Sequence, residues 1–290
     1  MSEDLRMATA APHPAVAGVV RRLVAWEEGA GAVPVVRRET ASVDVPLILN
    51  VGEPFSVRPL GGATAARHRG AFVAGIHDAP VDTACAGASA GVQVDLSPLG
   101  ARMLLGVPMS ELARRTVDLE DVLGAPARRL LEELAGLPAG PGRIAAVDRF
   151  VVARLSEAPR PPADVEWAWR RLAAARGRVA VGALAREIGC SGRHLAARFR
   201  DAVGVGPKLA ARILRFEAAQ EQLRRPGGPA PGAVAAACGY YDQAHLSRDV
   251  RAFAGATPGG LRPPPVTFVH DPPAGGRQGG PTPSDHRRTR

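Results

Sequence analysis

Histidine, aspartate and glutamine side chains stand close together near the C-terminus, where residues 237–258 read ACGYYDQAHLSRDVRAFAGATP. An aspartate three residues before a histidine could form a catalytic pair in which the carboxylate orients the imidazole. The same residue types also suit a helix in the major groove of DNA, where amide and guanidinium groups contact base edges. An earlier stretch of the chain favours the second interpretation.

That earlier stretch, residues 188–207, reads IGCSGRHLAARFRDAVGVGP and repeats the later one at an offset of 51 residues. The matched pairs are His194 with His245, Leu195 with Leu246, Phe199 with Val250, Gly204 with Gly255, and Pro207 with Pro258. An active site has no need of two equivalent histidines. The repeat therefore favours a duplicated supersecondary unit over a catalytic centre.

Each copy has the pattern of a helix, a glycine turn and a second helix. Gly189 and Gly239 can take the positive φ that ends a first helix. Ser191 and Asp242 are suited to the N-cap of the second helix, which we expect over 192–203 and 243–252. The expected buried residues of these second helices are Leu195, Phe199, Val203, Leu246, Val250 and Phe253. Two helices joined in this way form a helix-turn-helix.

The residues between the two copies, 207–223, read PKLAARILRFEAAQEQL and place apolar side chains on one stripe. This pattern predicts a long helix. At 1.5 Å per residue, about 16 residues extend over roughly 24 Å. A rod of that length could hold two reading helices on one face of a duplex, where successive major-groove segments lie about 34 Å apart.

The order helix-turn-helix, linker helix and second helix-turn-helix resembles the C-terminal domain of the AraC/XylS transcription regulators. The resemblance rests on RFEAAQEQL, residues 215–223, and on the stretch 237–258. The matching positions are Ala235, Gly239, Tyr240, Asp242, Gln243, His245, Arg248, Gly255 and Pro258. The chain departs from the family pattern at Leu246 and Val250, where aromatic residues are usual, and both changes keep an apolar side chain.

The resemblance implies that both second helices contact double-stranded DNA at a promoter or operator. The residues that it assigns to DNA binding are Ser191, Arg193, His194, Ala197, Arg200, Gln243, Ala244, His245, Ser247, Arg248 and Arg251. Gln243 suits a bidentate contact with adenine, and Arg248 suits guanine or a phosphate. In the first copy, Arg193 is expected to carry most of the base reading. Arg200 and Arg251 lie further along their helices, near where the phosphate backbone is expected.

The distribution of charge agrees with a DNA-binding C-terminal region. Residues 165–262 hold 15 arginines and one lysine against seven acidic residues, a net charge of +9. Residues 1–164 hold 17 arginines against 19 acidic residues, a net charge of −2. A basic region of this kind is the electrostatic footprint of a surface that binds phosphates.

The N-terminal half resembles the sensor halves of some members of the same family. The stretches that carry this resemblance are RGAFVAGIHDAPV, residues 69–81, and LGARMLLGVPMSELARRTVDLEDVLG, residues 99–124. Short β-like runs, at 43–51 and 91–96 among others, precede helical periodicity over 98–155. The expected fold is an α+β N-terminal domain, a small cupin-like β unit followed by helices. An all-α domain with two helix-turn-helix units and a long linker helix is expected after it.

Composition sets the expected domain boundaries. The stretch SEAPRPPAD, residues 156–164, is rich in proline and polar residues and is typical of a linker. We expect a sensor or dimerisation domain over 1–158, a linker over 159–164 and the DNA-binding domain over 165–265. Residues 266–290 are dense in proline and glycine, and we expect them to form a disordered tail.

No metal or other cofactor is expected. His68 and His77 invite a cupin metal site, but the H-x-H pair and the further glutamate and histidine of metallo-cupins are missing. We expect Arg67, His68 and Arg69 to be solvated in a glycine-rich loop. The alternative function is an enzyme that uses the DNA module for targeting, as adaptive alkyl-DNA repair proteins do. That chemistry needs a zinc-held cysteine cluster or a cysteine beside a histidine.

Only Cys85 lies outside the DNA-binding module, so the sequence favours a one-component transcription regulator without enzymatic activity. RNA polymerase, a small-molecule effector and a second copy of the chain are further candidate partners. The effector-binding residues, and whether the protein activates or represses, stay open. Without an apolar run of about 18 residues or a signal-peptide pattern, a cytoplasmic, nucleoid-associated location and no membrane partner are expected.

Overall fold

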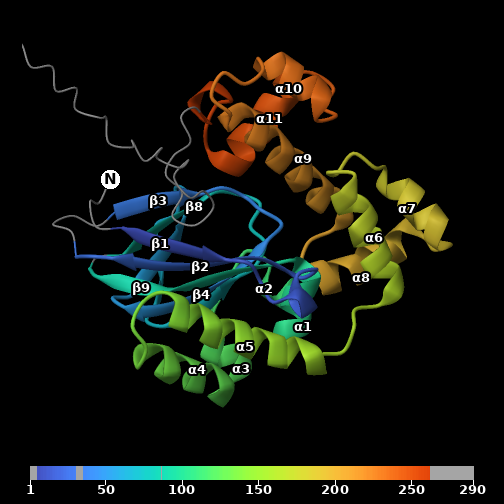
Figure 1. Cartoon of the computed structure of the whole chain (residues 1–290). Helices are drawn as coiled ribbons and strands as arrows, with labels where there is room; N and C mark the ends of the chain where they lie inside the picture. Colours follow the sequence, from blue (N-terminus) through green and yellow to red (C-terminus); the bar gives the residue numbers. More distant parts are fainter. Residues whose placement is uncertain (1–4, 31–34, 86, 262–290) are drawn as a thin grey trace, which may run out of the picture.

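The computed structural model describes residues 5–30, 35–85 and 87–261. An N-terminal β-rich domain is followed by a helical C-terminal region, as Figure 1 shows. The expected fold class is therefore confirmed. The tail expected over 266–290 lies outside the described residues. Within the described part of the chain, no helix combines the length and the apolar character needed to cross a membrane.

The strands form two antiparallel sheets. The six-stranded sheet has the order β1 (Arg6–Ala10), β2 (Val20–Glu28), β9 (Ser89–Leu96), β4 (Val45–Gly52), β7 (Ala71–Ala74) and β10 (Thr116–Asp118). The four-stranded sheet has the order β3 (Val35–Glu39), β8 (Val81–Cys85), β5 (Phe55–Pro59) and β6 (Ala66–His68). The β-like runs expected from sequence correspond to β4 and β9.

The alternation of side chains along β4 shows how one strand serves two cores. Val45, Leu47 and Leu49 belong to the main core, on the side of the sheet covered by helices. Ile48 points to the other side, because successive side chains of a strand face opposite ways. There it joins a smaller apolar cluster between the two sheets, made of Trp26, Ile48, Phe55, Val57, Phe72 and Cys85.

Helices cover the outer face of the six-stranded sheet (Figure 1). They are α1 (Pro98–Leu105), α3 (Leu119–Leu123), α4 (Ala125–Ala135) and α5 (Pro141–Glu157). The short helix α2 (Met109–Leu112) packs against α1, and a 3₁₀ helix, η1 (Pro14–Val16), lies against α5. The helical periodicity expected over 98–155 is thus interrupted. Residues 116–118 form β10, which pairs with β7 and extends the sheet.

The C-terminal helices are α6 (Ala163–Ala174), α7 (Val181–Ile188), α8 (Gly192–Val203), α9 (Pro207–Arg224), α10 (Pro231–Ala237) and α11 (Gln243–Ala254), and they are followed by η2 (Gly259–Leu261). Helices α7 and α8 form the first helix-turn-helix, and α10 and α11 form the second. Helix α9 joins them, as expected, and its 18 residues extend over about 27 Å.

The two turns are built alike. Gly189 and Gly239 have φ values of 77° and 75°, a left-handed conformation that glycine adopts without steric cost. The next backbone N–H in each copy donates to a carbonyl five residues earlier: Cys190 to Ala185 and Tyr240 to Ala235, both at 3.0 Å. These bonds satisfy carbonyls that the ends of α7 and α10 would leave unpaired. The duplication read from the sequence is therefore also a duplication of backbone geometry.

The expectation of a solvated loop around His68 is wrong for the histidine itself. Arg67 and Arg69 are exposed, but His68 is only 4% exposed and lies in β6. Its Nδ1 lies 2.6 Å from Asp118 Oδ1, and its ring stacks on Phe72 with the centroids 4.4 Å apart. The reason is β10, which the sequence did not predict. That strand brings the carboxylate beside the histidine and satisfies the buried imidazole.

Candidate nucleic-acid interface

Helix α8 has one buried and one exposed face. Its N-cap is Ser191, whose Oγ accepts a hydrogen bond from the backbone N–H of His194 at 3.1 Å. This bond satisfies one of the unpaired donors at the start of the helix. The expected core residues Leu195, Phe199 and Val203 are each 0% exposed. On the opposite side of α8 the exposed candidates are Arg193, His194, Ala197 and Arg200, with Ser191 just before them.

Helix α11 repeats this arrangement and extends two residues beyond the expected 243–252. Asp242 Oδ1 accepts from the backbone N–H of His245 at 2.7 Å. The expected core residues Leu246, Val250 and Phe253 are at most 1% exposed. The other face carries Gln243, Ala244, Arg248 and Arg251, which are exposed, and Ser247, which is half-buried.

His245 differs from its counterpart His194. The His245 side chain is half-buried and packs edge-on against the Tyr240 ring, with the centroids 5.1 Å apart. His194 is exposed. Neither histidine side chain forms a catalytic pair with the N-cap residue before it. Ser191 and Asp242 instead accept hydrogen bonds from the backbone N–H groups of His194 and His245.

Four arginines on the exposed faces of α8 and α11 lack acidic partners. In the described part of the chain, Arg193, Arg200 and Arg251 have no ion-pair or hydrogen-bond partner. Arg248 donates only to the carbonyl oxygen of Ala244, 3.4 Å away in its own helix. Guanidinium groups without a protein partner are suited to contact phosphates and base edges.

Several other arginines of the C-terminal region are paired with carboxylates. Arg198 lies 2.7 Å from Asp164, and Arg225 lies 2.6 Å from Glu221. The side chain of Glu221 also accepts from Arg176, and these two arginines lower the pKa of its carboxyl group. On α8 and α11, the arginines without a carboxylate partner are thus Arg193, Arg200, Arg248 and Arg251. Outside these two helices, Arg186 of α7 and Lys208 of α9 are also exposed and have no partner among the described residues.

The sequence did not single out two features of α11. Asp249 is 2% exposed and accepts from Arg212 of α9 at 2.7 Å, so an ion pair fixes α11 on the linker helix. The helical period would have placed this carboxylate on the buried face, between Leu246 and Val250, where a cationic partner is required. Tyr241, in the turn before α11, is 93% exposed.

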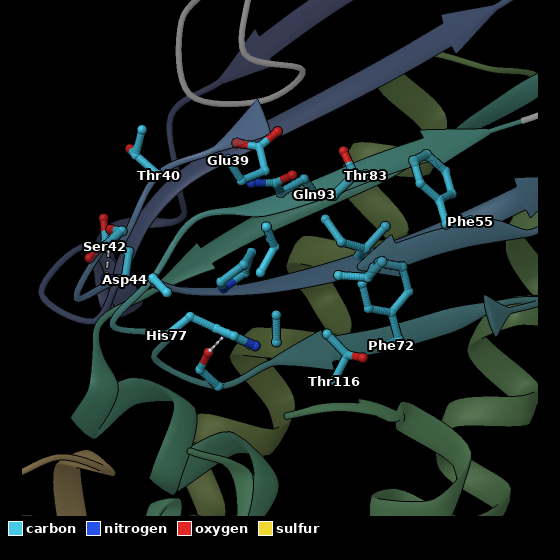
Figure 2. Close-up of a pocket in the computed structure, with 17 residues that line it drawn as sticks. Glu39, Thr40, Ser42, Asp44, Phe55, Phe72, His77, Thr83, Gln93 and Thr116 are labelled. Atoms are coloured by element: carbon cyan, nitrogen blue, oxygen red, sulfur yellow. Dashed lines mark hydrogen bonds between the residues drawn. The ribbon is translucent and has the colours of Figure 1, made fainter. Parts of the chain in front are cut away.

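A second candidate site is a cavity between the two sheets, with a volume of about 90 Å³. Figure 2 shows Phe55 and Phe72 at one end, Thr40, Ser42 and Asp44 at the other, and His77 and Gln93 between them. The lining residues come from seven strands and the connections after β3 and β7. Apart from the resemblance to sensor domains, no pattern in the sequence marks this cavity.

The cavity does not gather metal ligands. Among residues 5–30, 35–85 and 87–261, no group of three or more His, Cys, Asp or Glu side chains could hold a metal ion. His68 and His77 have separate partners, Asp118 and the carbonyl oxygen of Gly75.

Comparison with known proteins identifies the C-terminal region. Residues 184–263 match the family described as a helix-turn-helix domain. No curated protein matches the chain. Among solved structures, ToxT from Vibrio cholerae is 7% identical over 89% of this chain and 97% of its own, with a TM-score of 0.42.

Two further structures are similar to this one. The C-terminal domain of AraT, a response regulator from Geobacillus stearothermophilus, is 19% identical over 39% of this chain and 95% of its own, with a TM-score of 0.34. The AraC-like transcriptional activator CuxR is 14% identical over 72% of this chain and 85% of its own, with a TM-score of 0.29.

The family match and the two equivalent helix-turn-helix units define the class of the C-terminal domain. Residues 184–263 form a helix-turn-helix domain, as the sequence predicted. A helix-turn-helix is a DNA-binding motif whose second helix lies in the major groove.

Proposed function

We propose that the protein is a one-component regulator in which α8 and α11 read neighbouring major-groove segments of an operator and the N-terminal cavity binds a small-molecule effector. The observation that carries the DNA-binding part is the set of four arginines without acidic partners on the exposed faces of two equivalent helices. We assign DNA binding to residues 165–265, and effector binding or dimerisation to residues 1–158. The gap between α5 and α6, residues 158–162, supports this division.

The exposed groups of each helix suit different parts of a duplex. Gln243, at the first turn of α11, has the amide needed for a bidentate contact with adenine. Arg193, one position further along the first turn of α8, suits guanine, as does Arg248. Arg200 and Arg251 lie in the last turns and suit phosphates. The full proposed contact set is Ser191, Arg193, His194, Ala197, Arg200, Gln243, Ala244, His245, Ser247, Arg248 and Arg251.

The response to an effector is supported by contacts between the cavity wall and the DNA-binding helices. The segment after β3 lines the cavity, and Ser42 Oγ and the Val43 N–H both donate to Glu217 Oε1 of α9, each at 2.8 Å. The Ala41 N–H donates to the carbonyl oxygen of Phe253 in α11, also at 2.8 Å. A ligand that displaces this segment would therefore bias the position of α9 and α11.

The DNA-binding part of the proposal is tested by footprinting. Duplexes that bind the full chain would be selected from a random pool, and the bound site would be mapped by hydroxyl-radical cleavage. Because two equivalent helices contact one face of the duplex, we expect two protected segments about 10 base pairs apart. A single protected segment would show that only one helix-turn-helix contacts DNA.

A further inference from the structure

We infer that the cavity between the two sheets takes a small, largely apolar molecule that carries an N–H or O–H donor and no carboxylate. This inference rests on the proposed effector function of the cavity. It follows from the orientation of two polar side chains, from the charges around them and from the apolar wall opposite.

Gln93 presents an unsatisfied acceptor. Its side chain is 2% exposed, and its Nε2 donates to Asp95 Oδ1. Because an ionised carboxylate only accepts hydrogen bonds, this contact fixes which end of the amide faces Asp95. The carbonyl oxygen, Oε1, is buried and has no hydrogen-bond partner in the described part of the chain. A buried acceptor without a partner is costly, and a donor on a ligand would satisfy it.

His77, in the connection after β7, presents a second acceptor. Its Nδ1 lies 2.6 Å from the carbonyl oxygen of Gly75, so Nδ1 carries the proton of the neutral ring. Burial lowers the pKa of His77, which keeps the ring neutral at pH 7 and leaves Nε2 with a lone pair. Figure 2 shows the ring directed into the cavity. Within the residues that the structure describes, Nε2 has no protein partner.

The charges around the cavity oppose an anion. Its lining includes the carboxylates of Glu39 and Asp44, and no arginine or lysine is among the described residues that line it. Arg21 lies 3.6 Å from Asp44 but does not line the cavity. A ligand carboxylate would meet two carboxylates and two acceptors, and its charge would be buried without compensation. A neutral or protonated donor meets complementary groups.

The size and the apolar wall limit the rest of the ligand. Phe55, Phe72, Ile48 and Val57 form one side of the cavity. Its volume of about 90 Å³ is below the roughly 150 Å³ of an engineered apolar cavity that binds benzene. Because the cavity is also partly open to solvent, the largest molecule that fits is a single ring or a short branched chain with one donor group, part of which lies outside the enclosed volume.

Four probes with one phenylethyl skeleton test this inference: phenethylamine, 2-phenylethanol, ethylbenzene and 3-phenylpropionate. Their dissociation constants for the full chain would be measured by calorimetry or ligand-observed NMR. We expect the amine and the alcohol to bind at least about tenfold more tightly than the carboxylate, since one satisfied hydrogen bond supplies that factor. Ethylbenzene shares the ring and has no donor, so its affinity reports the apolar wall alone.

Variants at one position separate the acceptor from the fold. Gln93→Met keeps the shape and removes Oε1, so it is expected to weaken alcohol binding about fivefold and to leave ethylbenzene binding unchanged. Gln222→Met, on α9 outside the cavity, is the matched control and should change neither affinity. Carboxylate binding as tight as alcohol binding, or an alcohol affinity that is unchanged in Gln93→Met, would overturn this inference and leave the effector role of the cavity standing. Failure of every probe to bind at about 10 mM would overturn the effector role of the cavity as well.

Discussion

Replacing Phe253 with alanine is expected to lower the free energy of unfolding by about 3–5 kcal/mol. Its ring is 1% exposed and lies 5.4 Å, centroid to centroid, from Phe216 of the linker helix. The guanidinium carbon of Arg212 lies 5.1 Å from the centre of the same ring. The substitution removes buried apolar area and leaves a cavity between α9 and α11, because fixed helices cannot collapse fully onto the space.

Denaturant unfolding measures this loss, and Tyr241→Ala is the matched control. Tyr241 is an aromatic residue of the turn before α11, and its side chain is 93% exposed. Its loss should therefore change the free energy of unfolding by no more than about 0.5 kcal/mol. Equal effects of the two substitutions would contradict the packing of α11 on α9 described above.

DNA affinity is expected to fall about tenfold between 50 and 200 mM salt, because two phosphate contacts at roughly 0.9 each give a logarithmic slope near −1.8. The contacts are those of Arg200 and Arg251, the two arginines in the last turns of α8 and α11 that have no acidic partner. Arg200→Ala and Arg251→Ala should each flatten the slope by about one unit and weaken binding to all sequences alike.

A paired arginine provides the control for this measurement. Arg225 lies at the end of α9 and forms an ion pair with Glu221 at 2.6 Å. Because it already has a carboxylate partner, Arg225→Ala should leave the salt slope unchanged. A flattening as large as that of Arg200→Ala would mean that net charge, and not the face of α8, determines DNA binding.

The helix-turn-helix units could be predicted from the sequence because their signals are local. The glycine turns, the caps at Ser191 and Asp242 and the period of the apolar residues all act within a few positions along the chain. Because the helix-turn-helix unit occurs twice in the chain, each of these local patterns also occurs twice. The structure therefore agrees with the sequence to the residue on both ends of α8, and α7 ends at Gly189 as expected.

Features that depend on distant residues could not be predicted in the same way. Helix α6 escaped prediction, although its Trp169 packs on Phe199 of α8 with the ring centroids 6.3 Å apart. The burial of His68 depends on strand β10, almost 50 residues later in the chain. The cavity is assembled from seven strands and two connections, and no spacing along the chain marks its lining.

The central claim is that α8 and α11 read bases and do not merely contact the backbone. The most direct measurement of it is the ratio of affinities for a selected site and for a scrambled duplex of equal length. We expect this ratio to fall about 5- to 150-fold in Arg193→Ala and in Gln243→Ala, since a lost bidentate contact costs about 1–3 kcal/mol of discrimination. An unchanged ratio in both variants, with thermal unfolding like that of the unaltered protein, would contradict the assignment of these helices to base reading.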